Sequence, residues 1–307
     1  MSKDLAVRQS DSQVLHRGRV GTPASVASDV VAGHRPSSQR GFDRPRFLIV
    51  FTALVFVYLF APIVVVTWFS FNSKRSLQVF GTPSLTWYGQ LFNDPAIIGS
   101  LVASIEVALV TMVIATAIGT LLAFGLVRAQ SRLNRPTDVL MLLNLVTPEI
   151  VTGIALLLVF SQLGLTLSLT TVIIGHITFS IAYVTIIVRG RLASLNREVE
   201  EAALDLGATN LQAMRLVTLP ALWPAIVASG MLCFVMSFDD FVTSFFTTGI
   251  GTQVLPLRIY SMIHFGVTPE INAVGTVMMA ITIVIVLGAL LIFSRQQQAR
   301  QLAFIAE

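Results

Sequence analysis

Few residues of this 307-residue sequence are charged, and it has a single cysteine. Asp, Glu, Lys and Arg make up 12% of the chain, whereas soluble domains average roughly 25%. Mean hydropathy is +0.80, which excludes an ordinary soluble domain. The lone Cys233 excludes an intrachain disulfide and is expected to serve packing. We therefore interpret the chain as an all-α integral membrane protein.

The sequence also lacks the motifs of an enzyme. It has no G-x-x-x-x-G-K-[ST] phosphate loop, no His or Cys pair at metal-ligand spacing, and no nucleophile beside a base. Basic and aromatic residues are not interleaved as in a nucleic-acid groove. We expect no catalytic residue, cofactor, metal or nucleic-acid partner, and we expect His176 and His264 to be structural.

Six apolar stretches are long enough to cross a bilayer, which needs about 20 apolar residues per helix. They are 47–71, 100–127, 138–160, 169–188, 222–247 and 273–293. Residues 47–295 are therefore predicted to form a six-helix transmembrane domain. Residues 1–46 are polar and aperiodic and are predicted to be a disordered tail, and 296–307 a short C-terminal tail.

Basic residues predict the orientation of these spans. With six spans, most Lys and Arg fall on the side of both termini, whereas the other side holds Lys74, Arg75 and Arg258. The positive-inside rule then places both termini in the cytoplasm of a multi-pass plasma or inner membrane protein.

A charged segment, residues 189–220, interrupts the apolar pattern on the predicted cytoplasmic side. Glu198, Glu201 and Asp205 recur at helical spacing, and Gly207 is suited to end that helix in a left-handed conformation. Thr209 and Gln212 have capping-box spacing, so a second short helix is expected to begin there and to stop at Pro220. Two helices meeting at a glycine form a docking surface.

The segment resembles the coupling loop of ABC-importer permeases. That loop has the pattern E-A-A, three residues, Gly, nine residues, an apolar residue, one residue and Leu-Pro; Val217 stands where Ile is usual. The resemblance implies a type I permease fold with a cytoplasmic coupling helix. The implied contacts with an ATPase are Glu200, Glu201, Ala202, Ala203, Asp205, Gly207, Leu219 and Pro220.

A narrower resemblance covers roughly residues 47–293. The runs Ser237–Phe241, Leu255–Met262 and Gly266–Ala273, with Thr147–Val151, are similar to the second permease subunit of spermidine/putrescine importers. This resemblance implies that the chain pairs with a sister permease. It also implies a dimer of ATPase subunits that binds ATP and Mg, and an external binding protein that delivers the solute.

Acidic residues within the apolar stretches agree with a cationic solute. Charged groups at mid-bilayer cost about 2.5–3.5 kcal/mol on insertion scales and usually face a bundle interior or a wet cavity. No Lys or Arg lies within a span to neutralise them. The candidate pathway residues are Asp239, Asp240, Glu149, Phe238, Phe241 and Tyr183, the aromatics offering cation–π contacts.

The role of each acid stays open at this point. Asp239 and Asp240 are expected about 100° apart on one helix, so that one faces the path while the other caps or pairs with a neighbour. Glu149 either lines the path or bonds backbone freed by Pro148, and Glu106 either lines the path or contacts the sister subunit.

Three other functions compete with polyamine import. The same permease fold serves other solutes, such as amino-acid-like compounds, ferric iron or oxyanions. An ion-driven secondary transporter would use the buried acids as ion sites, but it leaves the charged segment unexplained, and no repeat of broken helices is present. A membrane receptor or scaffold does not need several buried acids.

Overall fold

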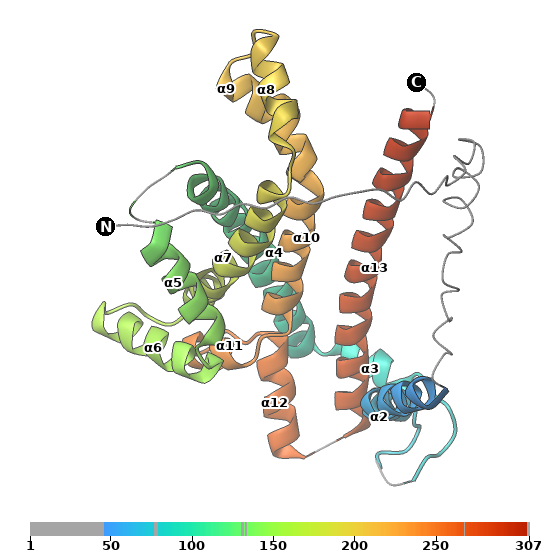
Figure 1. Ribbon diagram of the computed structural model, residues 1–307. Coiled ribbons are helices and arrows are strands. Elements are labelled where there is room, and N and C mark those ends of the chain that lie inside the picture. Colours follow the sequence, from blue (N-terminus) through green and yellow to red (C-terminus); the bar gives the residue numbers. More distant parts are fainter. Residues whose placement is uncertain (1–45, 77–78, 130–131, 133, 267, 306–307) are drawn as a thin grey trace, which may run out of the picture. The chain divides into compact units, whose positions relative to one another are not determined.

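The computed structural model describes residues 46–76, 79–129, 132, 134–266 and 268–305, which are mostly helical (Figure 1). The chain divides into two compact units, Met1–Leu59 and Phe60–Glu307. The described part of the first unit, residues 46–59, is the first portion of helix α2 (Arg46–Ser70). The predicted disordered tail, 1–46, lies outside the described residues except for Arg46.

Within the second unit, the helices that follow α2 form the transmembrane and connecting segments. They are α3 (Thr86–Asn93), α4 (Pro95–Arg128), α5 (Asn134–Val146), α6 (Glu149–Gln162), α7 (Leu169–Ala193), α8 (Arg197–Asp205), α9 (Asn210–Ala213), the π-helix η1 (Met214–Thr218), α10 (Leu219–Phe238), α11 (Val242–Thr247), α12 (Leu255–Phe265) and α13 (Pro269–Ile305). The predicted C-terminal tail, 296–307, is thus helical as far as Ile305.

The predicted set of six spans is confirmed by length and composition. Five described helices are long and apolar enough to cross a membrane, and the bent pair α5 and α6 makes six if the pair is one span. Each of the six corresponds to one of the apolar stretches in the sequence.

The third span is not the straight helix that the apolar run 138–160 predicted. Helices α5 and α6 are bent by 111° at the break between Val146 and Glu149. Pro148 lacks a backbone N–H and disfavours helical geometry in the residue before it, which explains why the helix breaks here. Glu149, expected near the middle of a span, becomes the first residue of α6.

The fifth span was also predicted too long. Helix α10 ends at Phe238, and Asp239, Asp240 and Phe241 form a non-helical connection to α11. The Asp240 carboxylate accepts a hydrogen bond from the Ser244 amide at 2.8 Å, which stabilises a separate N-terminus for α11. The two aspartates therefore do not lie on one continuous helix.

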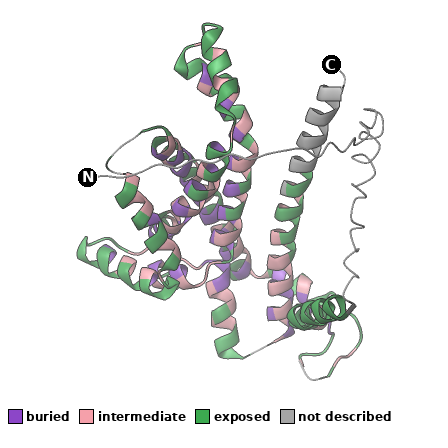
Figure 2. Ribbon diagram, in the orientation of Figure 1, coloured by how far each residue is buried: buried purple, intermediate pink, exposed green. Residues whose placement is uncertain are grey.

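Small residues on α4 allow close packing against α7 and α10. Ala115 and Ala123 are fully buried, and a Cβ atom on Gly119 would lie 2.6 Å from Val184 of α7. Buried residues concentrate on these three helices, whereas α2 and α6 are largely exposed (Figure 2). Close helix approach through small residues is typical of membrane bundles, whose outer apolar faces meet lipid or partner helices.

Candidate functional site

The coupling loop, residues 189–220, forms a helical hairpin at the end of α7 and α10 (Figure 1). The Asn196 side chain accepts from the Glu198 amide and begins α8. Gly207 has a φ of +90° and closes that helix. The predicted capping box is present, because Thr209 and Gln212 each bond the other's backbone N–H.

The predicted stop at Pro220 is wrong. Helix α9 continues through η1 into α10, and Pro220 lies in the first turn of α10. A proline in a regular helix clashes with the carbonyl four residues earlier, here Leu216, which lies in the π-helix. The wider π turn, a common local adjustment, lets the chain continue through this position.

The outward side of the coupling loop is exposed. No residue of α8 is buried, and Leu206 is 90% exposed. Figure 2 shows the hairpin of α8 and α9 mostly as exposed residues. Of the predicted coupling residues, Ala203 is half-buried, and Glu201, Ala202, Asp205, Gly207, Leu219 and Pro220 are exposed. Glu200 differs, because it pairs with Arg128 of α4.

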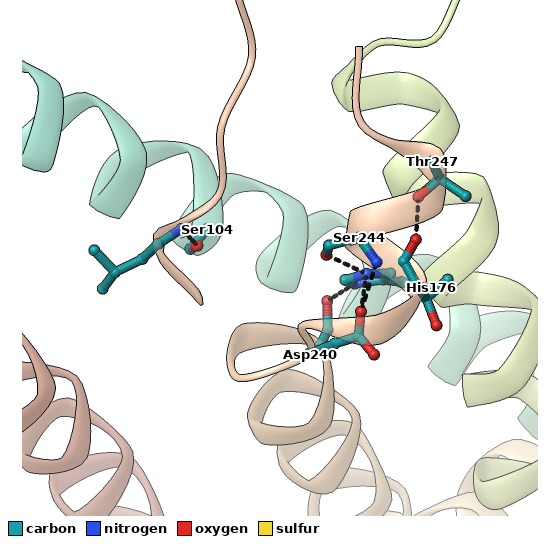
Figure 3. A network of polar contacts seen from close by, with 8 residues as sticks. Ser104, His176, Asp240, Ser244 and Thr247 are labelled. Atoms are coloured by element: carbon teal, nitrogen blue, oxygen red, sulfur yellow. Dashed lines mark hydrogen bonds and ion pairs between the residues drawn. The ribbon is translucent and has the colours of Figure 1, made fainter. Parts of the chain in front are cut away.

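A buried polar network lies toward the other end of α10 (Figure 3). His176 of α7 is fully buried. Its Nδ1 atom lies 2.7 Å from the Ser237 hydroxyl, and its Nε2 atom lies 3.1 Å from the Ser244 hydroxyl. The same Nε2 atom lies 3.1 Å from Asp240 Oδ2. An ionised carboxylate only accepts, so Nε2 carries a proton toward Asp240.

This network gives Asp240 a structural task. Its carboxylate contacts α7 through His176 and begins α11 through the Ser244 amide. Thr171 reinforces the same contact by donating to the Thr247 carbonyl at 2.7 Å. The break after α10 is therefore held to α7 by partners that satisfy each polar group, as buried groups require.

Asp239 and Glu149 are placed differently from Asp240. Both side chains are exposed, and Asp239 is close enough to Asp240 and Glu149 to interact electrostatically. Within the described residues, neither Asp239 nor Glu149 is joined to a basic side chain by an ion pair. Glu149 is at the N-terminus of α6, where the helix dipole favours a negative charge.

A cavity of about 100 Å³, here called the acid cavity, brings several of these residues together. Its lining is mostly polar and aromatic and includes no Lys or Arg. It consists of Asn144, Leu145, Thr147, Glu149, Thr152, Phe179, Tyr183, Met236, Asp240 and Thr243. Helices α5, α6, α7 and α10 and the segment at α11 thus converge on a site rich in oxygen atoms.

The three candidate aromatic residues have different environments. Tyr183 lines the acid cavity. Phe241 is half-buried, with its ring centroid 4.9 Å from that of Tyr260. Phe238 is fully buried in the apolar core and stacks on Phe234 at 5.8 Å, so the structure gives it a packing environment away from the cavity.

Sequence reasoning missed the joint role of His176, Ser237 and Ser244. The only available signal was a set of polar residues within apolar stretches, and helix geometry alone does not pair residues 61 or 68 positions apart. It also missed Arg128 as the partner of Glu200. Among the described residues, no group of three or more His, Cys, Asp or Glu could hold a metal ion.

Comparisons with known proteins agree with this arrangement. Residues 115–303 match the family model described as "Binding-protein-dependent transport system inner membrane component". The chain is 34% identical to the spermidine/putrescine transport system permease protein PotC of Haemophilus influenzae, over 82% of this chain and 97% of that protein. It is 34% identical to the putrescine transport system permease protein PotI of Escherichia coli, over 84% of this chain and 94% of that protein.

Solved structures give the same fold. A bacterial ABC transporter involved in import of the acidic polysaccharide alginate matches with a TM-score of 0.66 and 15% identity, over 89% of this chain and 98% of that chain. An amino acid ABC transporter matches with a TM-score of 0.55 and 18% identity, over 69% of this chain and 96% of that chain. The chain therefore belongs to the family of inner membrane components of binding-protein-dependent transport systems.

Proposed function

We propose that this chain is the half of an ABC importer's membrane path that conducts polyamines of the spermidine and putrescine class. The main observation in support is the acid cavity, which is lined by Glu149 and Asp240 and by no Lys or Arg. Asp239 lies close enough to both acids to interact electrostatically. The relatives named for spermidine and putrescine transport support the same solute.

The chemistry of a polyamine fits these acids. Its amines resemble that of lysine, whose pKa is about 10.4, and they are protonated at neutral pH. Asp239 and Glu149 are exposed and offer carboxylates to such cations, while Tyr183 adds the face of an aromatic ring. Each contact is weak enough to be broken again, as conduction requires. Asp240, paired with His176, positions this site.

The driving force enters at the coupling loop. As a permease of this family, the chain has no nucleotide site of its own, and ATP is hydrolysed by partner ATPase subunits. In our proposal, the exposed side of α8, with Glu201 and Ala202, docks on the ATPase dimer. A sister permease completes the path, an external binding protein delivers the solute, and both termini and the coupling loop face the cytoplasm.

The decisive experiment measures ATPase activity of the complex that co-purifies with the tagged chain in nanodiscs. The complex is titrated with spermidine, putrescine, an amino acid and an oxyanion, each with the cognate binding protein. Stimulation by polyamines alone is expected. Stimulation by another solute alone contradicts the substrate assignment, and absence of any co-purifying ATPase contradicts the assignment of the coupling loop.

A further inference from the structure

Glu200 of α8 is held by two side chains from other elements of its own chain. Arg128 Nη2, in the last turn of α4, lies 2.7 Å from Glu200 Oε2. The Thr218 hydroxyl of η1 donates to the same oxygen at 3.1 Å and lies 3.4 Å from Arg128 Nη2. The three side chains therefore form a closed triangle between three elements.

We propose that Arg128, Glu200 and Thr218 form a latch that makes α4 move together with the coupling loop. Glu200 is then a positioning residue, whereas its neighbour Glu201 remains available for the ATPase. This inference rests on the proposed docking of the ATPase at the coupling loop. It adds a second mechanical link between the loop and the membrane helices, besides the direct chain connections through α7 and η1.

The surroundings of the latch hold it in one geometry. Thr218 is 3% exposed, and the side chains of Glu200 and Arg128 are 24% and 37% exposed. The Arg128 guanidinium also lies over the Phe124 ring, 5.6 Å from its centroid. Isolated surface ion pairs contribute little, but a network that includes a buried hydroxyl and an aromatic face restricts both charged side chains.

The coupling loop needs such a link because α8 has no buried residue to anchor it. Helix α8 packs on α9 and η1, which belong to the same loop. A cavity of about 470 Å³ separates the loop from the bundle and is lined by Val127 and Leu192 on the bundle side and Leu204 on the loop side. Arg128 and Glu200 line this cavity too, so the latch is a polar bridge across an otherwise loosely filled region.

The mechanical consequence follows from the packing of α4. This helix packs along α7 and α10, which also contribute to the acid cavity. A displacement of the coupling loop that also moves α4 carries all three helices together. Without the latch, the loop moves α4 only through its packing against α7 and α10, and ATP hydrolysis is then partly uncoupled from transport.

The test uses the full complex with its ATPase and binding protein, reconstituted in proteoliposomes. The variants are Arg128→Gln, Glu200→Gln and the charge swap of Arg128→Glu with Glu200→Arg. Arg132→Gln is the matched control, because Arg132 is exposed near the same end of α4 and makes no ion pair within the described residues. The readouts are solute transported per ATP hydrolysed and the amount of ATPase subunit bound.

Both single variants are expected to keep the ATPase bound and active but to transport about fivefold less solute per ATP, the factor that corresponds to about 1 kcal/mol. The charge swap is expected to recover most of the loss, and Arg132→Gln is expected to show none. Unchanged transport per ATP in both single variants overturns the latch. Loss of bound ATPase in Glu200→Gln alone also overturns it, since Glu200 is then a docking contact.

A cross-link tests the latch by replacing its ionic link with a covalent one. Arg128→Cys and Glu200→Cys, in a Cys233→Ala background, are joined by a short bis-thiol reagent in the assembled complex. Retained transport is expected, because the latch stays closed through the cycle; a cross-link that stops transport overturns the proposal. A wild-type chain that binds no ATPase instead contradicts the proposed function, a separate outcome from either result.

Discussion

The coupling loop and the acid cavity are built in opposite ways, although α7 and α10 contribute to both. In the loop, residues close in sequence set each turn: Asn196 begins α8, Gly207 ends it and Thr209 begins α9. In the polar network that holds Asp240 at the cavity, the partners are distant, because His176 contacts Ser237 and Ser244 from 61 and 68 residues away.

The difference matches what each region has to do. Caps and turns within the loop set the ends of its short helices without burying their outer side, so the loop can leave that side free for another protein. A charged group within a membrane bundle needs fixed partners instead, because an unpaired buried charge is costly. Substitutions in the loop should therefore impair coupling in a stable bundle, whereas substitutions in the network around the cavity should first impair stability.

Gly207→Trp should give the largest loss of transport and should disrupt the coupling loop without disturbing the membrane bundle. A residue with a side chain in the left-handed conformation costs about 1–2 kcal/mol, and the indole would extend from the exposed Gly207 position, which has open space around its Cβ. We expect solute uptake to be abolished and the ATPase to dissociate, with normal thermal stability of the membrane bundle. Uptake and co-purification of the ATPase measure this.

The control for this variant is Gly190→Ala, at a helical glycine of α7 with open space around its Cβ position. It should transport normally. Normal uptake by Gly207→Trp, in contrast, would falsify the role of the glycine in coupling.

His176→Ala should give the next largest effect, by destabilising the polar network next to the acid cavity. Removing the imidazole leaves buried hydrogen-bonding groups without their partner, which costs about 1–3 kcal/mol per group and more for a charged one. Asp240 and the hydroxyl groups of Ser237 and Ser244 would lose their shared partner. We expect a markedly lower melting temperature in detergent, measured by fluorescence-detected size exclusion after heating.

Ser180→Ala is a matched control on the same helix. The Ser180 hydroxyl is buried and has no hydrogen-bond partner among the described residues, so its removal should leave the melting temperature nearly unchanged. Equal melting temperatures for His176→Ala and Ser180→Ala would contradict the anchoring role of the network.

The same contrast explains how far the sequence could predict this protein. The elbow at Gly207 and the capping box at Thr209 could be predicted because their signals lie within a few residues of each other. The path of the chain through Pro220 could not, because a π-helix accommodates the proline and leaves no sequence signal. The six spans followed from hydropathy, which is insensitive to where a helix bends.

The cavity was predictable only as a set of residue types. The acids and Tyr183 stood out as polar groups in apolar stretches, but the bend at Pro148 and the break at Asp239 decide which of them meet. The pairing of Asp240 with His176 depends on the approach of α7 to α11, which is a tertiary contact. Phe238 shows the reverse case, since its neighbours in sequence suggested a path and its burial assigns it to the core.

Asp239→Asn and Glu149→Gln should reduce polyamine transport without reducing the stability of the protein. Each removes an exposed carboxylate without a basic partner in the described residues, so stability should hardly change. Polyamine uptake should fall about tenfold in the double variant, equivalent to about 1.4 kcal/mol of barrier, while the ATPase stays bound. Uptake of labelled putrescine and the melting temperature are measured on the same preparations.

Asp240→Asn is the comparison for these two variants. Because Asp240 is paired with His176 and begins α11, its substitution should lower the melting temperature more than Asp239→Asn does. Equal losses of stability in Asp239→Asn and Asp240→Asn would contradict the assignment of Asp239 to the solute path and of Asp240 to the structural network.

The smallest expected effect, from Asn196→Ala, tests whether the coupling loop really depends on local signals. The substitution removes the side-chain acceptor of the Glu198 amide and should destabilise α8 by about 1 kcal/mol. Hydrogen exchange in nanodiscs should become faster in the first turn of α8 and stay unchanged at the network of His176. Asn196→Asp keeps a capping oxygen and should preserve the exchange rates. Faster exchange in both variants would mean that the Asn196 amide group matters for something other than capping, such as its contact with the Glu198 carboxylate at 2.9 Å, and unchanged exchange in Asn196→Ala would show that the loop is held by its link to α4 more than by its own caps.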